Sequence, residues 1–308
     1  MSLLTPDEVL LHVAQGKSLQ SAELSRLNLA NQTLEGGDFS QAYLRGGKFT
    51  GATCRSTNFT KATLYFANFT EANVVGVNFT QAELNSSICN GANFSGAICV
   101  KSKFYSASLN YINARGADFS QADLRESCAP HADFSEVKGD RAHFGRSKFT
   151  EATFSAGSFR QTQFVQAQLE ETQWQGATLD KANFQDASLR NAQFHQAQLI
   201  EANFGYTHLE SISFLQAELL EAKFINTVLT AIDFSQASLY DSDFEGAHLI
   251  KVNLEQANLT NVNFENTHWQ ETDFVNCNVT GATFTDAEGL TAEQKQWLRQ
   301  NGATNVPD

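Results

Sequence analysis

The sequence predicts an all-β solenoid, and three observations support this fold class. A large residue, the centre of a unit, recurs every five positions from Leu24 to Phe284, which makes 53 units without a slip. Two residues before each centre stands a small residue, mostly Ala, Ser, Thr, Gly or Val, and the other three positions are mostly polar. A period of five matches neither a helix nor a plain strand, but it fits a short strand followed by a corner. One such unit buries almost nothing alone, so the units must stack.

The order of the centres predicts four units in each coil. From Phe144 to Phe244 every second centre is aromatic, and from Leu169 on those between are mostly Leu. Like residues stack on like only if the number of units per coil is even, and two units would leave too narrow a tube. Of the 25 Phe, 24 are centres, and Phe66 is the exception. The predicted core column is Phe144, Phe164, Phe184, Phe204, Phe224, Phe244, Phe264 and Phe284.

Individual units resemble a known repeat family. The units ADFSQ, ADLRE, ANFSG, ANFGY and ANLTN resemble the A(D/N)LXX signature of the bacterial pentapeptide repeat family. The resemblance implies a right-handed quadrilateral β-helix, here of about 13 coils of four units. Between residues 86 and 141 several centres are undersized, which indicates either a packing transition or a bend that a partner recognises.

Short helices are expected at both ends, which divides the chain into 1–18, 19–288 and 289–308. Thr5, Pro6 and Glu8 form a helix start with a capping box, and Thr291 with Gln294 repeats this pattern. Both helices are expected to cap open coil ends, which otherwise offer strand edges for aggregation. The resemblance implies an alternative for the second helix, in which Trp297 and Leu298 join two copies into a homodimer.

Charge differs between the halves of the chain. Residues 1–150 hold 14 Lys/Arg and 13 Asp/Glu, whereas residues 151–308 hold 7 and 21. Nucleic-acid binding needs a basic face, so no direct nucleic-acid binding is expected. No basic leader with an apolar run and no stretch long enough to span a bilayer is present, and the five Cys form no CxxC pair. We therefore expect a cytoplasmic protein without a membrane partner.

Motifs for catalysis or cofactor binding are missing from the sequence, which contains no Walker loop, GxSxG or HExxH. We therefore expect no enzyme activity and no cofactor. Cys54, Cys89 and Cys99 are centres, where a thiol acts as a small apolar filler. His208, His248 and His268 share one outward column interrupted by Val228, and without a third ligand we expect a polar ladder and no metal.

Two neighbouring outward columns depart from the polar pattern. Apolar residues occupy one column in three consecutive coils, and carboxylates occupy the next. Like charges on adjacent strands repel, and apolar groups rimmed by charge are typical of a partner surface. The predicted partner-binding residues are Ile200, Glu201, Leu220, Glu221, Tyr240 and Asp241.

Three functions are compatible with the sequence. The first is a non-enzymatic, regulatory scaffold that binds a protein through an outer wall. The second, implied by the resemblance, is a DNA mimic that binds gyrase or topoisomerase and protects it from quinolones; residues 151–288 hold 19 acids against 5 bases. The third, which no residue selects, is a secretion-system effector or accessory protein.

Overall fold

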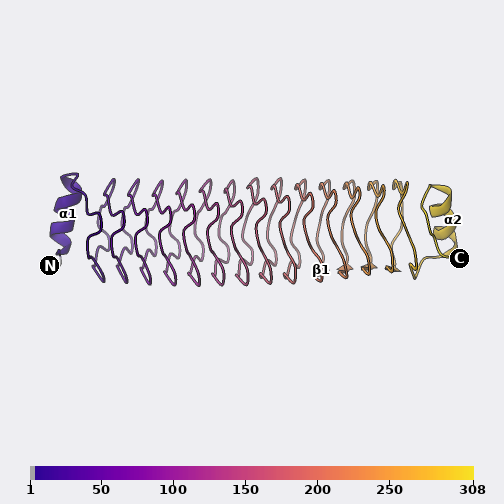
Figure 1. Cartoon of the computed structure of the whole chain (residues 1–308), viewed down its shortest axis with the longest axis horizontal. Helices are drawn as coiled ribbons and strands as arrows, with labels where there is room; N and C mark the ends of the chain where they lie inside the picture. The colour runs from indigo at the N-terminus through magenta and orange to yellow at the C-terminus, as the bar shows by residue number, and fades with distance from the viewer. Residues whose placement is uncertain (1–3) are drawn as a thin grey trace. The chain divides into compact units, whose positions relative to one another are not determined.

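The computed structural model describes residues 4–308 and contains two short helices, α1 (Pro6–Ala14) and α2 (Ala292–Gln300), with β-helical coils in the chain between them (Figure 1). Residues twenty apart pair in parallel, as in Glu23 with Tyr43 and Asn183 with Asn203. Most pairs are single β-bridges. Within the described residues four strands of three residues form, and they pair in the order β1 (His208–Glu210), β2 (Val228–Thr230), β3 (His248–Ile250) and β4 (His268–Gln270). The predicted right-handed quadrilateral β-helix with four five-residue units per coil is confirmed.

Most corners of a coil are tight turns closed by one backbone hydrogen bond. The amide of Ala197 donates to the carbonyl of Phe194 at 3.1 Å, and the same bond links the corresponding residues of other units. The residue two places after the centre takes a positive φ, for example 56° at Gln196. A positive φ at the third residue of a four-residue turn is typical of type II turns and favours Gly or Asn. Gln, Glu, Lys and even aromatic residues occupy this position here, so the stacked coils impose the conformation.

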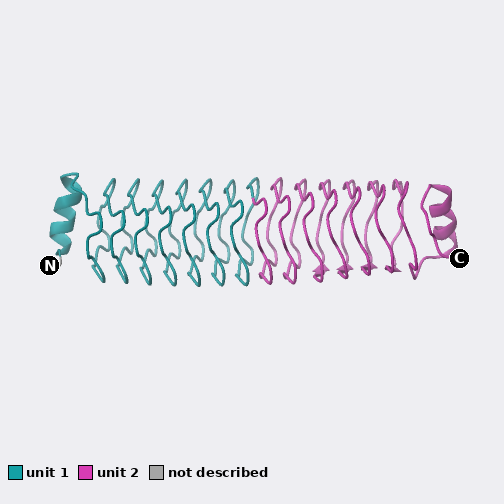
Figure 2. Cartoon of the chain, in the orientation of Figure 1, with its two compact units in different colours: residues 1–158 teal, residues 159–308 magenta. Residues whose placement is uncertain are grey.

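The chain forms two compact units, residues 1–158 and 159–308 (Figure 2). In unit 2, Phe rings twenty residues apart lie nearly parallel, with centroids 4.9 Å apart and a 2° angle between Phe184 and Phe204. The first coils of unit 1 stack in the same way, with Phe49 and Phe69 4.5 Å and 4° apart, but from Phe79 onward contacts that step by fifteen residues appear, from Phe79 to Phe94 and from Phe104 to Phe119, at 5.7 Å each. A step of fifteen moves the ring to a neighbouring wall of the coil, and the undersized centres Cys99 and Gly139 stand one coil after Phe79 and Phe119 on the wall that the rings leave.

The centres form the core of both units. All eight residues of the predicted core column are buried, with exposed fractions of 1% or less: Phe144, Phe164, Phe184, Phe204, Phe224, Phe244, Phe264 and Phe284. Cys54, Cys89 and Cys99 are also fully buried, and burial raises the pKa of Cys54 and of Cys89 to about 12. The small residues beside the centres include buried hydroxyls that donate to nearby carbonyls, as Ser127 Oγ does to Leu124 O at 2.6 Å.

The two helices cover the ends of their own units. Thr5 and Thr291 both form the predicted capping boxes. Val9 of α1 and Leu298 of α2 are fully buried. After α2, the chain returns to the last coil, where the Phe284 amide donates to Thr304 O at 3.0 Å. Both helices therefore act as caps on exposed coil ends.

Candidate functional site

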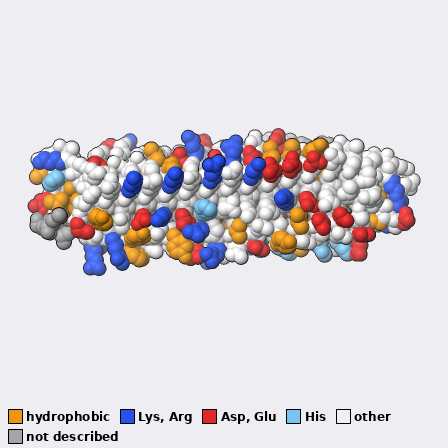
Figure 3. All heavy atoms as spheres, in the orientation of Figure 1, with side chains coloured by type: hydrophobic (Ala, Val, Ile, Leu, Met, Phe, Trp, Pro, Cys, Tyr) orange, Lys and Arg blue, Asp and Glu red, His pale blue; other side chains and the backbone are white. Residues whose placement is uncertain are grey.

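The predicted partner-binding residues come together on one corner of unit 2, which we call the acidic stripe: Ile200, Glu201, Leu220, Glu221, Tyr240 and Asp241. Backbone hydrogen bonds connect its three coils, from Glu201 N to Leu220 O at 2.8 Å and from Glu221 N to Tyr240 O at 3.0 Å. Tyr240 is 38% exposed, and Ile200 and Leu220 are half-buried. In the space-filling view, acidic side chains lie in a row beside hydrophobic ones on the face of unit 2 that is visible (Figure 3).

The carboxylates of the acidic stripe are not equivalent. Glu201 Oε1 lies 3.0 Å from Lys181 Nζ in the preceding coil, so its charge is partly compensated. Glu221 and Asp241 belong to none of the ion pairs found among residues 4–308. All three have a positive φ of 55–56°. Asn and Gly adopt this backbone conformation at least as readily, so the turn itself does not require a carboxylate. The uncompensated charge therefore lies at the second and third coils of the stripe.

The two predicted dimerisation residues of α2 have different surroundings. Leu298 is fully buried within its own chain, so it is closed to a second copy. Trp297 is half-buried and stacks on Phe274 with centroids 6.1 Å apart. It lines an open groove of about 450 Å³ together with Phe274, Val275, Asp273 and Glu293. Of the pair, only Trp297 offers a surface for self-association.

The histidine column is confirmed as a ladder in register. His208, Val228, His248 and His268 pair in sequence across the four parallel strands. The rings of His248 and His268 stack at 5.3 Å, and His268 Nδ1 lies 3.2 Å from Glu288 Oε2. Within residues 4–308 no group of three or more His, Cys, Asp or Glu side chains is arranged to hold a metal ion. In the same part of the chain no helix has the length and apolar character needed to cross a bilayer.

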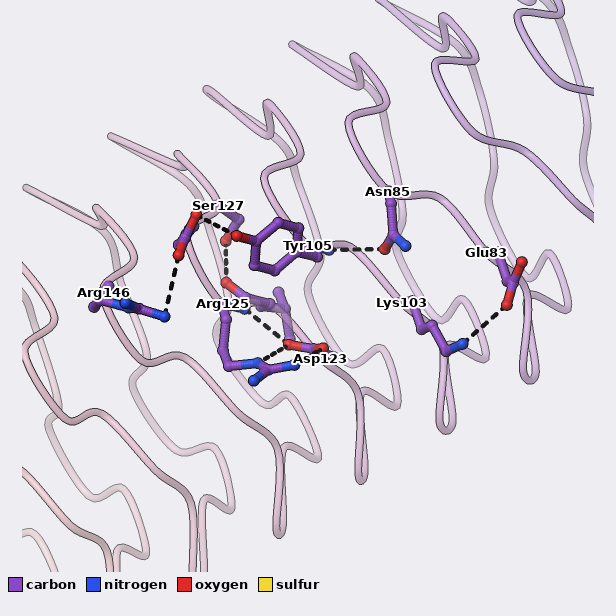
Figure 4. A network of polar contacts seen from close by, with 10 residues as sticks. Glu83, Asn85, Lys103, Tyr105, Asp123, Arg125, Ser127 and Arg146 are labelled. Atoms are coloured by element: carbon purple, nitrogen blue, oxygen red, sulfur yellow. Dashed lines mark hydrogen bonds and ion pairs between the residues drawn. The ribbon is translucent and has the colours of Figure 1, made fainter.

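Unit 1 carries a polar network that the repeat pattern alone does not reveal (Figure 4). Tyr105 Oη donates to Glu126 Oε2 at 2.5 Å, and Arg146 Nη2 lies 3.2 Å from Glu126 Oε1. Arg125 binds both oxygens of Asp123, at 2.8 and 2.7 Å, while its guanidinium lies 6.0 Å from the centroid of Tyr105. The hydrogen bond to Glu126 raises the pKa of the Tyr105 phenol. The one signal in the sequence is the spacing of Glu126 from Tyr105 and from Arg146, 21 and 20 residues, close to one coil.

A second part of the network lies one coil earlier. Lys103 Nζ donates to Glu83 Oε1 at 2.9 Å, and Tyr65 Oη donates to Glu83 Oε2. These two bonds, the one from Tyr65 first, lower the pKa of Glu83. The charges in this part of unit 1 are therefore largely paired within the chain.

The architecture defines the class of protein: a β-solenoid of five-residue repeats with helical caps. Two family models match, described as "Pentapeptide repeats (8 copies)" within residues 22–155 and "Pentapeptide repeat region" over 147–224 and 217–292. The chain belongs to the pentapeptide repeat family.

Solved structures of the same family are similar to this chain. HetL, a pentapeptide repeat protein involved in heterocyst differentiation regulation in the cyanobacterium Nostoc sp. strain PCC 7120, is 21% identical; the match covers 91% of this chain and 96% of HetL, with a TM-score of 0.35. A trypsin-treated form of QnrB1, a plasmid-mediated fluoroquinolone resistance protein, is 19% identical over 75% of this chain and 89% of its own, with a TM-score of 0.37. A pentapeptide repeat protein of the Arabidopsis thaliana thylakoid lumen is 33% identical over 37% of this chain and 79% of its own, with a TM-score of 0.21. No curated protein matches the chain.

Proposed function

We propose that this protein is a non-enzymatic scaffold that binds a partner protein through the acidic stripe of unit 2. The observation that carries the proposal is the repetition of an apolar side chain beside a carboxylate in three consecutive coils. Elsewhere on the corners, polar residues such as Gln and Asn serve equally well, as in the ladder from Gln196 to Gln216 and Gln236, with amide bonds of 2.9 and 2.8 Å. The stripe therefore departs from what the fold needs.

The chemistry of the stripe indicates the kind of partner. The apolar column contains half-buried Ile200 and Leu220 and the exposed ring of Tyr240, which suit contact with apolar side chains. Glu221 and Asp241 make no ion pair within the described chain and suit contact with Lys or Arg. The proposed partner surface is therefore apolar with a basic rim, and the rigid coils present the stripe to it without ordering cost.

The finer alternative of a DNA mimic is supported by the charge of unit 2, where residues 159–308 hold 7 Lys/Arg and 20 Asp/Glu. However, many of these acids lie outside the stripe on other columns, such as Glu210, Asp233 and Glu255. DNA presents its charge as evenly spaced phosphates. The single acidic row beside apolar groups favours a protein partner that reads this one corner.

A reversal of charge on the stripe tests the proposal. We expect the triple variant Glu201→Lys, Glu221→Lys and Asp241→Lys to lose a partner captured by the wild type from the native host, while its circular dichroism and melting remain unchanged. The matched control reverses three exposed acids on other columns, at Glu210, Glu245 and Glu255, and should retain the partner. Equal capture by both variants would contradict the proposal. If the wild type protects quinolone-poisoned gyrase and both variants lose this protection equally, the result would favour DNA mimicry.

Self-association through α2 would use Trp297. The test compares the oligomeric states of the wild type and of Trp297→Ser, each measured by sedimentation. A dimer that dissociates in the variant supports this contact, and a wild-type monomer at high concentration rejects it.

A further inference from the structure

A corner of unit 1 presents exposed aromatic rings next to cations, and we call it the corner patch. It consists of Arg26, Arg45, Tyr65 and Phe66 at the corner, with Tyr43 and Lys48 on the walls before and after it. Backbone hydrogen bonds of 2.8 Å run from Arg26 N to Arg45 O and from Gly46 N to Tyr65 O, so the patch spans three successive coils. Phe66 is 56% exposed and Tyr43 is 51% exposed. Both rings are therefore open to solvent on a surface that is otherwise largely polar.

Phe66 occupies a position that the fold does not favour for an aromatic residue. It follows the centre by two places and has a φ of 60°. A bulky residue with positive φ is an outlier that Asn or Gly would relieve. It is also the single Phe of the chain outside the repeat centres. An exposed ring that costs stability and fills no core is a candidate for binding.

The cations of the corner patch are uncompensated, unlike Arg125 of the polar network. The Arg45 guanidinium lies 5.4 Å from the centroid of Phe66, yet Arg26, Arg45 and Lys48 are in none of the ion pairs found among residues 4–308. By contrast, the guanidinium of Arg125, over Tyr105, is held by Asp123. Two acids beside the patch have partners of their own: Glu23 accepts a hydrogen bond from Ser25 N at 3.0 Å, and Glu83 accepts from Tyr65 Oη and from Lys103 Nζ. The patch thus combines positive charge with apolar rings.

We propose that the corner patch binds an acidic peptide segment of a partner protein that carries one aromatic or aliphatic side chain. The apolar side chain rests on Phe66 and Tyr43, and the carboxylates contact Arg26 and Arg45. Arg, Tyr and Phe are the residues enriched at protein interfaces, and an arginine already stacked on a ring gives up little freedom on binding. This surface is separate from the acidic stripe and selects a partner of opposite charge.

The test uses the full-length protein and a fluorescein-labelled peptide of nine residues, with one central Phe flanked by Asp and Glu. We expect saturable binding by fluorescence anisotropy that weakens as NaCl is raised. Phe66→Asn should reduce the affinity at least about 10-fold, as expected for a central aromatic anchor. It should keep or raise the melting temperature, because Asn tolerates positive φ.

Tyr206→Asn is the matched control. Tyr206 stands at the corresponding place in a unit-2 coil, has a φ of 62° and is 61% exposed, but no cation is stacked on its ring in the described structure. This variant should bind the peptide as the wild type does. An equal loss in both variants, or no saturable binding by the wild type, overturns the proposal. Tighter binding of a twelve-residue oligothymidylate that Phe66→Asn abolishes would also overturn it and assign the patch to single-stranded nucleic acid.

Discussion

Units 1 and 2 share one backbone repeat but differ in both core and surface. Unit 2 stacks aromatic rings in parallel columns, with Phe184 and Phe204 only 2° apart, whereas unit 1 begins with such columns and moves its rings between walls from Phe79 onward. Unit 1 holds 14 Lys/Arg and 14 Asp/Glu, whereas unit 2 holds 7 and 20. The difference shows that the five-residue backbone tolerates several core arrangements and leaves the outward columns free to carry function.

Substitutions in the core columns should cause the largest loss of stability. Phe204 contacts four rings, two of them at 4.9 and 5.1 Å in parallel stacks, whereas Phe119 meets the rings of Phe104 and Phe134 at 5.7 and 5.4 Å, both tilted. Loss of a buried Phe costs about 3–5 kcal/mol. We expect Phe204→Ala to lie near the top of this range and Phe119→Ala near the bottom, measured by urea denaturation. The reverse order would contradict the view that unit 2 has the better-packed core.

A substitution in α2, the cap of unit 2, should cause the next largest loss of stability. Leu298→Asp places a charge where the side chain is fully buried and should cost roughly 3 kcal/mol. Hydrogen exchange should then speed up in the last coil, and the exposed coil end should promote aggregation. Gln296→Asp, on the exposed side of α2, is the control and should leave both properties unchanged. Unchanged exchange in Leu298→Asp would show that α2 does not protect the coil end.

A smaller gain is expected at turn positions with alanine. Ala156 in unit 1 and Ala231 in unit 2 have φ values of 55° and 54°. Asn accepts this conformation more readily, so each Ala→Asn change should stabilise its unit by about 0.5–1 kcal/mol. Thermal melting of the two variants provides the measurement. A gain in one unit alone would show that the turns are strained differently in the two units.

A substitution in the polar network of unit 1 should cause the smallest change in stability. The pKa of Glu83 is lowered by Tyr65 and then by Lys103, so its stabilising contribution is present above the ordinary pKa and is lost as pH falls through the lowered value. Glu83→Gln should therefore cost less than about 1 kcal/mol at pH 7. Once the pH has fallen below the lowered pKa of Glu83, wild type and variant should have equal stability. A difference that persists in acid would mean that packing, not charge, explains the effect.

The sequence predicted the fold in detail because the repeat encodes it directly. Each centre, from Leu24 to Phe284, specifies a buried side chain, and the 20-residue register follows from the alternation of Phe and Leu. The capping boxes at Thr5 and Thr291 likewise depend on local sequence alone. These features need no knowledge of distant contacts.

The surface was harder to predict from sequence. The acidic stripe could be found because its residues stand in columns, but the pairing of Lys181 with Glu201 depends on side-chain conformation. Phe66 stood out as the Phe that is no centre, yet its contact with Arg45 emerges only in three dimensions. The burial of Leu298 also depends on how α2 folds back on the last coil.

The most direct test of the central claim, that the outward columns carry the function and the centres carry the fold, is a quantitative capture experiment with the acidic stripe. We expect the triple Lys variant at Glu201, Glu221 and Asp241 to melt within a few degrees of the wild type, because all three side chains point away from the core, but to retain none of the wild-type partner. Retention of the same partner in the same amount by this folded variant would contradict the claim.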